Sequence, residues 1–136
     1  EHLSIAAFIM FSDVELTIAC AKELLGKVPE FDVLITAESK GIPLAYEMSR
    51  QSGKKYLLAR KSVKLYMKKP VAVDVKSITT AKLQTLYIDS DDIASLEQLV
   101  HKAGGKIVGK AAVLAEGDAM ERKDLIVLAP LPVFEK

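Results

Sequence analysis

The feature that most constrains this fold is a mostly apolar, β-branched run at residues 31–36, which is followed by a short polar loop and then by Pro43. Such a run is typical of a strand that is buried on both faces. Pro43 suits the first turn of a helix and Gly53 suits the position after its end, so residues 41–50 are predicted to be helical. A buried strand that leads directly into a helix is the building unit of α/β domains.

The rest of the chain repeats this alternation. The capping-box pattern of Ser12 and Glu15 predicts a helix that ends at Gly26, and Ser90 is predicted to cap another helix that ends at Gly104. Strands are predicted at residues 55–59, 71–78, 84–89, 106–115 and 125–129. This order predicts an α/β fold with a mostly parallel sheet flanked by helices and a short antiparallel flap.

Composition limits the class of protein. A length of 136 residues predicts a single domain, residues 1–136, and a chain that is 50% hydrophobic and 27% charged has an ordinary globular composition. No apolar run reaches the roughly 18 residues of a membrane span. No basic segment precedes the first apolar stretch, so a signal peptide is not expected. The single cysteine, Cys20, excludes an internal disulfide and favours a reducing, cytoplasmic location.

Charge is unevenly distributed, although the net charge is only +1. Residues 54–69 contain basic and no acidic side chains: Lys54, Lys55, Arg60, Lys61, Lys64, Lys68 and Lys69. Residues 89–97 contain the opposite charge: Asp89, Asp91, Asp92 and Glu97. A basic segment and a carboxylate cluster in one domain suggest an anionic ligand with a divalent cation. The alternative is two solvated faces with no ligand.

The sharpest candidate site is the loop formed by Ala37, Glu38, Ser39, Lys40 and Gly41. It joins the carboxyl end of the buried strand to a helix, which is where open α/β sheets bind their ligands. Free amides at the helix start, the helix dipole and the Lys40 ammonium would attract an anion there. Gly41 would let the backbone approach a ligand closely. The alternative is a tight turn without a ligand.

Other motifs are weaker. Residues 104–111 nearly match a P-loop, but Ala111 replaces the magnesium-binding hydroxyl and the helix precedes the strand, the reverse of the required order. His2 and His101 lack a second ligand at metal spacing, so no protein metal site is expected. Cys20 lies mid-helix among apolar residues, which indicates a core position rather than a nucleophile.

Several segments, taken in order and spacing, resemble type I phosphoribosyltransferases of the adenine or xanthine branch. Residues 32–46 resemble that family's strand, pyrophosphate loop and helix, with Glu38-Ser39-Lys40-Gly41 at its Glu-x-Arg/Lys-Gly motif. Residues 56–61 resemble the next strand, and residues 62–86 fall where the family carries a mobile loop. Residues 113–118 and 131–134 resemble its closing segments. The resemblance spans residues 3–134 and implies the family's Rossmann-like fold.

The resemblance also implies an activity, in which a purine nitrogen displaces pyrophosphate from C1 of phosphoribosyl pyrophosphate. It implies that pyrophosphate is bound by Glu38, Ser39, Lys40, Gly41, Arg60, Lys61 and Lys64. Asp91 and Asp92 are the implied catalytic residues, near the ribose hydroxyls, and Leu131, Val133 and Phe134 would line the purine pocket. Mg²⁺ would arrive with phosphoribosyl pyrophosphate, residues 68–80 would form a lid, and the protein would be a cytoplasmic homodimer with small-molecule substrates and no membrane partner.

One family motif is absent, namely the strand, acidic pair and Thr-Gly-Gly-type loop that cradles the 5′-phosphate. Its nearest counterpart is residues 86–95, which contain a carboxylate pair but no glycine. Three explanations stay open: residues of the protein are missing from the sequence, the chain is a shortened form, or residues 85–89 replace the lost strand and place Asp91 and Asp92 at its end. A chain without a central strand should be unstable or associate.

We therefore expect a purine-type phosphoribosyltransferase, with two alternatives. A non-catalytic relative, or a shortened remnant, could bind a nucleotide or phosphoribosyl pyrophosphate as a regulatory signal, which the missing cradle favours. An RNA-binding protein could use residues 54–69, where Tyr56 and Tyr66 would stack on bases. Few aromatic residues and a near-neutral charge argue against nucleic acid as a partner.

Overall fold

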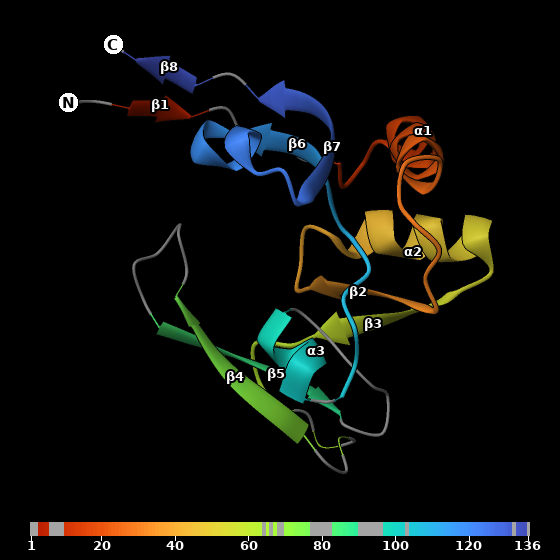
Figure 1. Ribbon diagram of the computed structural model, residues 1–136, viewed down its shortest axis with the longest axis vertical. Coiled ribbons are helices and arrows are strands. Elements are labelled where there is room, and N and C mark those ends of the chain that lie inside the picture. Colours follow the sequence, from red (N-terminus) through yellow and green to blue (C-terminus); the bar gives the residue numbers. More distant parts are fainter. Residues whose placement is uncertain are drawn as a thin grey trace.

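The computed structural model describes residues 3–5, 10–63, 65, 67, 70–76, 83–89, 97–102, 104–131 and 133–135. The elements are, in order, β1 (Leu3–Ile5), α1 (Val14–Leu25), β2 (Val33–Ala37), α2 (Ile42–Ser52), β3 (Lys55–Ala59), β4 (Pro70–Lys76), β5 (Leu83–Asp89), α3 (Glu97–Lys102), β6 (Lys110–Glu116), the 3-10 helix η2 (Gly117–Glu121), β7 (Leu125–Leu131) and β8 (Val133–Glu135). Figure 1 shows the arrows of β2, β3, β6 and β7 pointing the same way. The predicted α/β class is confirmed.

Hydrogen bonds join the strands in pairs. β2 lies parallel to β3, with Val33 opposite Lys55, and β6 lies parallel to β7, with Lys110 opposite Leu125. β4 and β5 form an antiparallel hairpin, which is the predicted flap, and β1 pairs antiparallel with β8. The expected parallel strands flanked by helices are therefore present, as two parallel pairs.

Within the described part of the chain, β2 and β6 each have a single strand neighbour. All five residues of β2 are consequently half-buried, whereas a strand buried on both faces was expected. The explanation in which residues 85–89 replace a lost parallel strand is wrong, because β5 pairs antiparallel with β4 from Leu83 to Asp89. Each parallel pair is thus a two-stranded sheet, and neither of its outer edges has a strand partner among the described residues.

The helix ends follow local chemistry. α1 begins one residue later than the capping box predicted, because Asp13 rather than Ser12 is the N-cap and its Oδ1 accepts a hydrogen bond from Leu16 N at 2.9 Å. α1 ends at Gly26 as predicted. α2 ends at Gly53, whose φ of 68° lies in the left-handed region that glycine adopts without strain. The strand predicted from residue 106 begins only at residue 110, since residues 105–109 pair with none of the described strands.

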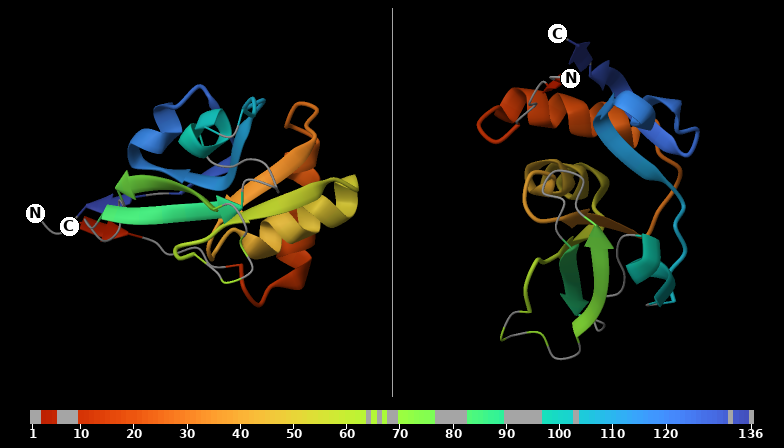
Figure 2. Two further views of the ribbon diagram at one scale, coloured as in Figure 1. Left: turned by 90° about the horizontal axis from the view of Figure 1, so that it is seen from below. Right: turned by 90° about the vertical axis from the view of Figure 1, so that its left-hand side faces the viewer.

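The core lies where the two long helices meet the two parallel pairs. α1 packs against β6 and β7, α2 packs against β2 and β3, and the helices contact each other (Figure 2). Ala21 and Leu24 of α1 are fully buried beside Met48 of α2. Apolar residues from all sides surround this cluster: Leu25, Leu34, Leu44, Val113, Ile126 and Leu128. Cys20 is buried, which agrees with its predicted core position.

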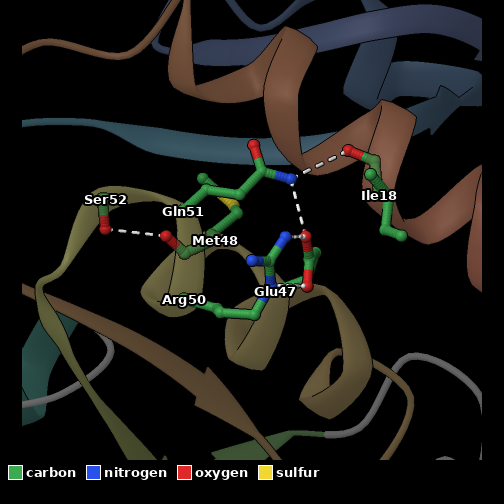
Figure 3. Close-up of polar contacts among 6 residues, drawn as sticks. All are labelled: Ile18, Glu47, Met48, Arg50, Gln51 and Ser52. Atoms are coloured by element: carbon green, nitrogen blue, oxygen red, sulfur yellow. Dashed lines mark hydrogen bonds and ion pairs between the residues drawn. The ribbon is translucent and has the colours of Figure 1, made fainter.

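A buried carboxylate lies at the contact between the helices (Figure 3). Glu47 is 6% exposed, and both of its oxygens accept hydrogen bonds from Arg50, at 2.8 and 2.7 Å. Gln51 Nε2 donates to Glu47 Oε1 at 2.7 Å and to the carbonyl oxygen of Ile18 at 3.1 Å. The hydrogen bond from Arg50, followed by that from Gln51, lowers the pKa of Glu47 to about 2. Because Ile18 belongs to α1, this network ties α2 to α1.

Candidate functional site

The candidate site lies at the carboxyl ends of β2 and β3, which are adjacent because the strands are parallel and in register from Val33 to Ala37. The loop after β2 supplies Glu38, Ser39 and Lys40, and the residues after β3 supply Arg60 and Lys61. The structure therefore brings together the two predicted pyrophosphate-binding segments, which are separated by the whole of α2 in the sequence.

Glu38 is the organising residue of this cluster. Its Oε1 accepts a hydrogen bond from Arg60 Nη1 at 2.7 Å, and its Oε2 accepts one from Lys61 N at 3.0 Å. Its own backbone N–H donates to Ala59 O at 3.0 Å. The carboxylate thus holds Arg60 and the end of β3 beside the loop. Because a carboxylate repels an anion, the role that these contacts indicate for Glu38 is positioning rather than direct binding.

Positive charge faces solvent next to this carboxylate. Lys40 and Lys61 are both exposed, and so is Ser39, which directly precedes Lys40 in the loop. The N-terminus of α2 has no side-chain cap and no acidic residue in its first turn, so its dipole adds uncompensated positive potential. This arrangement can attract an anion with several oxygens.

Gly41 has a packing role that its sequence position did not reveal. A Cβ at this residue would overlap the hydroxyl of Thr36 in β2. Its φ of −79° is ordinary, so glycine is needed here for space and not for an unusual backbone conformation. The close backbone approach expected at Gly41 is thus an approach to β2.

The other predicted site residues are distributed differently. Lys64, Asp91 and Asp92 lie outside the described residues, as do the ends of the predicted lid. Leu131 is half-buried at the carboxyl end of β7, directly opposite Glu116 on β6. The backbones of Val133 and Phe134 belong to β8 and pair with those of Ile5 and Ser4. Of the residues predicted to line the purine pocket, Leu131 therefore belongs to the β6–β7 pair and Val133 and Phe134 to the β1–β8 pair. The described residues predicted to bind pyrophosphate lie at the β2–β3 pair.

Sequence reasoning missed Glu116. Its Oε1 is shielded from solvent and accepts no hydrogen bond from the described residues. In the sequence, Glu116 could be noticed only as an acidic residue at the end of an apolar strand. That pattern does not show that one of its oxygens is shielded.

The described basic residues of the segment lie at two opposite ends of β3. Lys54 and Lys55 lie at the amino end of β3, whereas Arg60 and Lys61 lie at its carboxyl end. The ring of Tyr56 packs edge-to-face against that of Tyr46, with 6.5 Å between centroids. Tyr66 is outside the described residues. This division across a strand argues against a dedicated RNA-binding surface.

The remaining motifs keep their structural interpretations. Gly105 N donates to Val100 O at 2.7 Å and Gly104 has a φ of 80°, so this glycine pair ends α3 as predicted and forms no P-loop. Across the residues described here, no three His, Cys, Asp or Glu side chains gather into a metal-binding group. None of the helices in the described part of the chain has the length and apolar character that crossing a membrane requires.

Comparison with known proteins gives one kind of match. No protein-family model and no curated protein matches the chain. Among solved structures, the adenine phosphoribosyltransferase of Thermoanaerobacter pseudethanolicus matches with a TM-score of 0.71 and 15% identity, over 90% of this chain and 84% of that one. The APRTase of Giardia lamblia, complexed with 9-deazaadenine, matches with a TM-score of 0.73 and 15% identity, over 89% and 82%.

A third match is the adenine phosphoribosyltransferase of Trypanosoma brucei, in complex with AMP, pyrophosphate and ribose-5-phosphate. Its TM-score is 0.72 and its identity 10%, over 89% of this chain and 67% of that one. Likeness at these identities establishes the fold. The chain therefore has the phosphoribosyltransferase fold, and the predicted resemblance is confirmed at that level.

Proposed function

We propose that this protein is a purine-type phosphoribosyltransferase, which transfers the phosphoribosyl group of phosphoribosyl pyrophosphate to a purine base and releases pyrophosphate. The observation that carries the proposal is the cluster at the carboxyl ends of β2 and β3, in which Glu38 holds Arg60 beside exposed Lys40 and Lys61. The fold supports the proposal, because the matching solved structures described above are adenine phosphoribosyltransferases.

In the proposed reaction the bond from C1 of the ribose to pyrophosphate breaks as a bond from C1 to a purine nitrogen forms. Negative charge develops on the leaving pyrophosphate while the ribose becomes cation-like. Lys40, Lys61 and the N-terminus of α2 would stabilise the leaving group, and Glu38 would keep the Arg60 guanidinium in place beside it. The fixed positions of these charges reduce the reorganisation that the reaction requires.

The remaining roles in this proposal belong to residues that the family resemblance implied. Ser39 and Gly41 would contribute loop backbone to the pyrophosphate site, with Lys64 nearby. Asp91 and Asp92 would contact the ribose, and Leu131, Val133 and Phe134 would line the purine slot. Mg²⁺ would arrive with the pyrophosphate oxygens and would need few protein ligands. This agrees with the contacts of Glu38, because both of its carboxylate oxygens already accept hydrogen bonds, from Arg60 and Lys61.

The first test is pyrophosphate binding by the Lys40→Ala variant. We expect its dissociation constant for magnesium pyrophosphate, measured by isothermal titration calorimetry, to rise about 10-fold, because one charge-assisted contact is lost. Lys40 is exposed, so the melting temperature should not change. Lys27→Ala, at an exposed lysine beyond α1, is the matched control. Equal affinities of the two variants for magnesium pyrophosphate would contradict the assignment of this loop to the pyrophosphate site.

A second candidate is binding without turnover. It is favoured by β2, whose second edge has no strand neighbour in the described part of the chain, and by the absence of a glycine loop in the sequence for the 5′-phosphate. A radiolabelled adenine assay distinguishes the candidates. AMP formation that depends on phosphoribosyl pyrophosphate supports the enzyme, whereas AMP binding without such formation supports a regulatory binding protein.

A further inference from the structure

The two segments that form the candidate site contain a carboxylate among their cations. Residues 37–41 and 59–63 hold one acidic side chain, Glu38, together with three basic ones, Lys40, Arg60 and Lys61. A carboxylate repels the anion that the basic side chains attract. Glu38 therefore lowers the affinity of this cluster for any anion that binds there.

The contacts of Glu38 fix its charge beside that of Arg60. The carboxylate accepts hydrogen bonds from Arg60 Nη1 at 2.7 Å and from Lys61 N at 3.0 Å, and the backbone N–H of Glu38 donates to Ala59 O at 3.0 Å. The side chains of Arg60 and Glu38 are only 31% and 22% exposed, so solvent and salt screen their charges less than those of a fully exposed pair. We therefore expect the carboxylate to stay in place when an anion binds nearby.

This fixed charge matters most after the proposed reaction. When the bond from C1 to pyrophosphate breaks, the leaving oxygen keeps the bonding electron pair, so free pyrophosphate carries one more formal negative charge than the same group in the substrate. Cations alone would hold this product more tightly than the substrate. A fixed carboxylate opposes that gain, because its repulsion increases with the charge of the ligand. Product release limits the turnover of many enzymes.

We propose that Glu38 is a positioning residue with a second effect: it orients Arg60, and it limits how tightly the site holds free pyrophosphate, so that the product is released. This inference rests on the proposed function. Lys40 and Lys61 attract the diphosphate group, whereas Glu38 offsets part of the Arg60 charge. A partly screened unit charge next to a bound anion changes its affinity by about 3- to 10-fold.

The test is the affinity of Glu38→Gln for magnesium pyrophosphate in isothermal titration calorimetry. Glutamine removes the negative charge and keeps an oxygen that accepts a hydrogen bond. We expect the dissociation constant to fall by about 3- to 10-fold relative to the wild type, so that the variant binds more tightly. The gain should shrink when the ionic strength rises from about 0.05 M to about 0.5 M, because salt screens repulsion.

The matched control is Asp32→Asn, which removes the same charge from an exposed residue just before β2, at the opposite end of that strand. Its dissociation constant should stay close to that of the wild type. Thermal denaturation establishes that each variant is folded. If Glu38→Gln does not fold, Glu38→Ala with Asp32→Ala as its control gives the same comparison.

The outcomes separate this inference from the proposed function. A wild-type protein that does not bind magnesium pyrophosphate contradicts both. A wild-type protein that binds it, with equal or weaker binding by Glu38→Gln, contradicts the effect of Glu38 on release and leaves the proposed function standing. Tighter binding that is the same at both ionic strengths, or that also occurs in Asp32→Asn, contradicts local repulsion by Glu38 as the cause.

Discussion

At the scale of single residues, the site depends on how closely its loop is packed against β2. Gly41 lies against Thr36, whose hydroxyl occupies the space that a side chain would need. The loop that carries Lys40 can therefore keep its position only with glycine at residue 41. The close packing of Gly41 against β2 therefore fixes where the Lys40 charge lies.

This packing makes a mutational prediction. Gly41→Ala should lower the free energy of unfolding by about 1–3 kcal/mol, because the new methyl group overlaps Thr36 and the loop must shift. Thr36→Ala in the same chain should recover part of that loss, since it removes the overlapping hydroxyl. Gly26→Ala is the control, because its nearest neighbour, Glu23 O, would lie at an ordinary 3.5 Å. Urea denaturation is measured for the wild type, the Gly41→Ala and Thr36→Ala single variants, the double variant and Gly26→Ala. Additive losses in the double variant would contradict the overlap.

The residues that could be predicted from sequence are those with local signals. Lys40, Arg60 and Lys61 follow strands, so the parallel arrangement alone predicts that they meet. Glu38 was expected to bind pyrophosphate, but its contacts with Arg60 and Lys61 appear only when two distant segments are joined. The buried oxygen of Glu116 likewise depends on tertiary packing, which no local pattern reports.

At the scale of elements, the capping-box, glycine and proline signals located the ends of α1 and α2 to within about two residues, and β3 matches its predicted range of 55–59. β1 and β8 were not predicted, because each has three residues and pairs with a partner at the other end of the chain. The half-buried state of β2 was also not predictable, since it depends on how many strands lie beside it.

The network around Glu47 joins α1 to α2 and predicts a pH dependence. Folding lowers the pKa of Glu47 from an ordinary value of 4.5 to about 2, mainly through Arg50. A lowered pKa contributes stability that is fully present above pH 4.5 and is lost as the pH falls toward 2. The melting temperature of the wild-type protein should therefore decrease in this interval more steeply than that of Glu47→Gln. Glu23→Gln, at an exposed position of α1, should follow the wild-type curve; equal slopes for Glu47→Gln would contradict this role.

At the scale of the whole molecule, the strand pairs leave much surface exposed. β2 and β6 each present an edge without a strand partner among the described residues. Open edges and half-buried apolar strands favour association with other chains. The homodimer expected from the family resemblance would be one way to cover this surface.

We accordingly predict that the protein associates in a concentration-dependent manner. Sedimentation velocity should show a mass above 14.8 kDa at micromolar concentrations, and the melting temperature should rise with protein concentration because association stabilises the folded chain. Ala111→Lys places a charge at an exposed position of β6 and should weaken association, as lysines do on natural edge strands. Ala19→Lys, on the exposed side of α1, is the matched control. A monomer at every concentration would contradict the predicted association. If both lysines weakened association equally, the weakening would come from the added positive charge and not from a contact at β6.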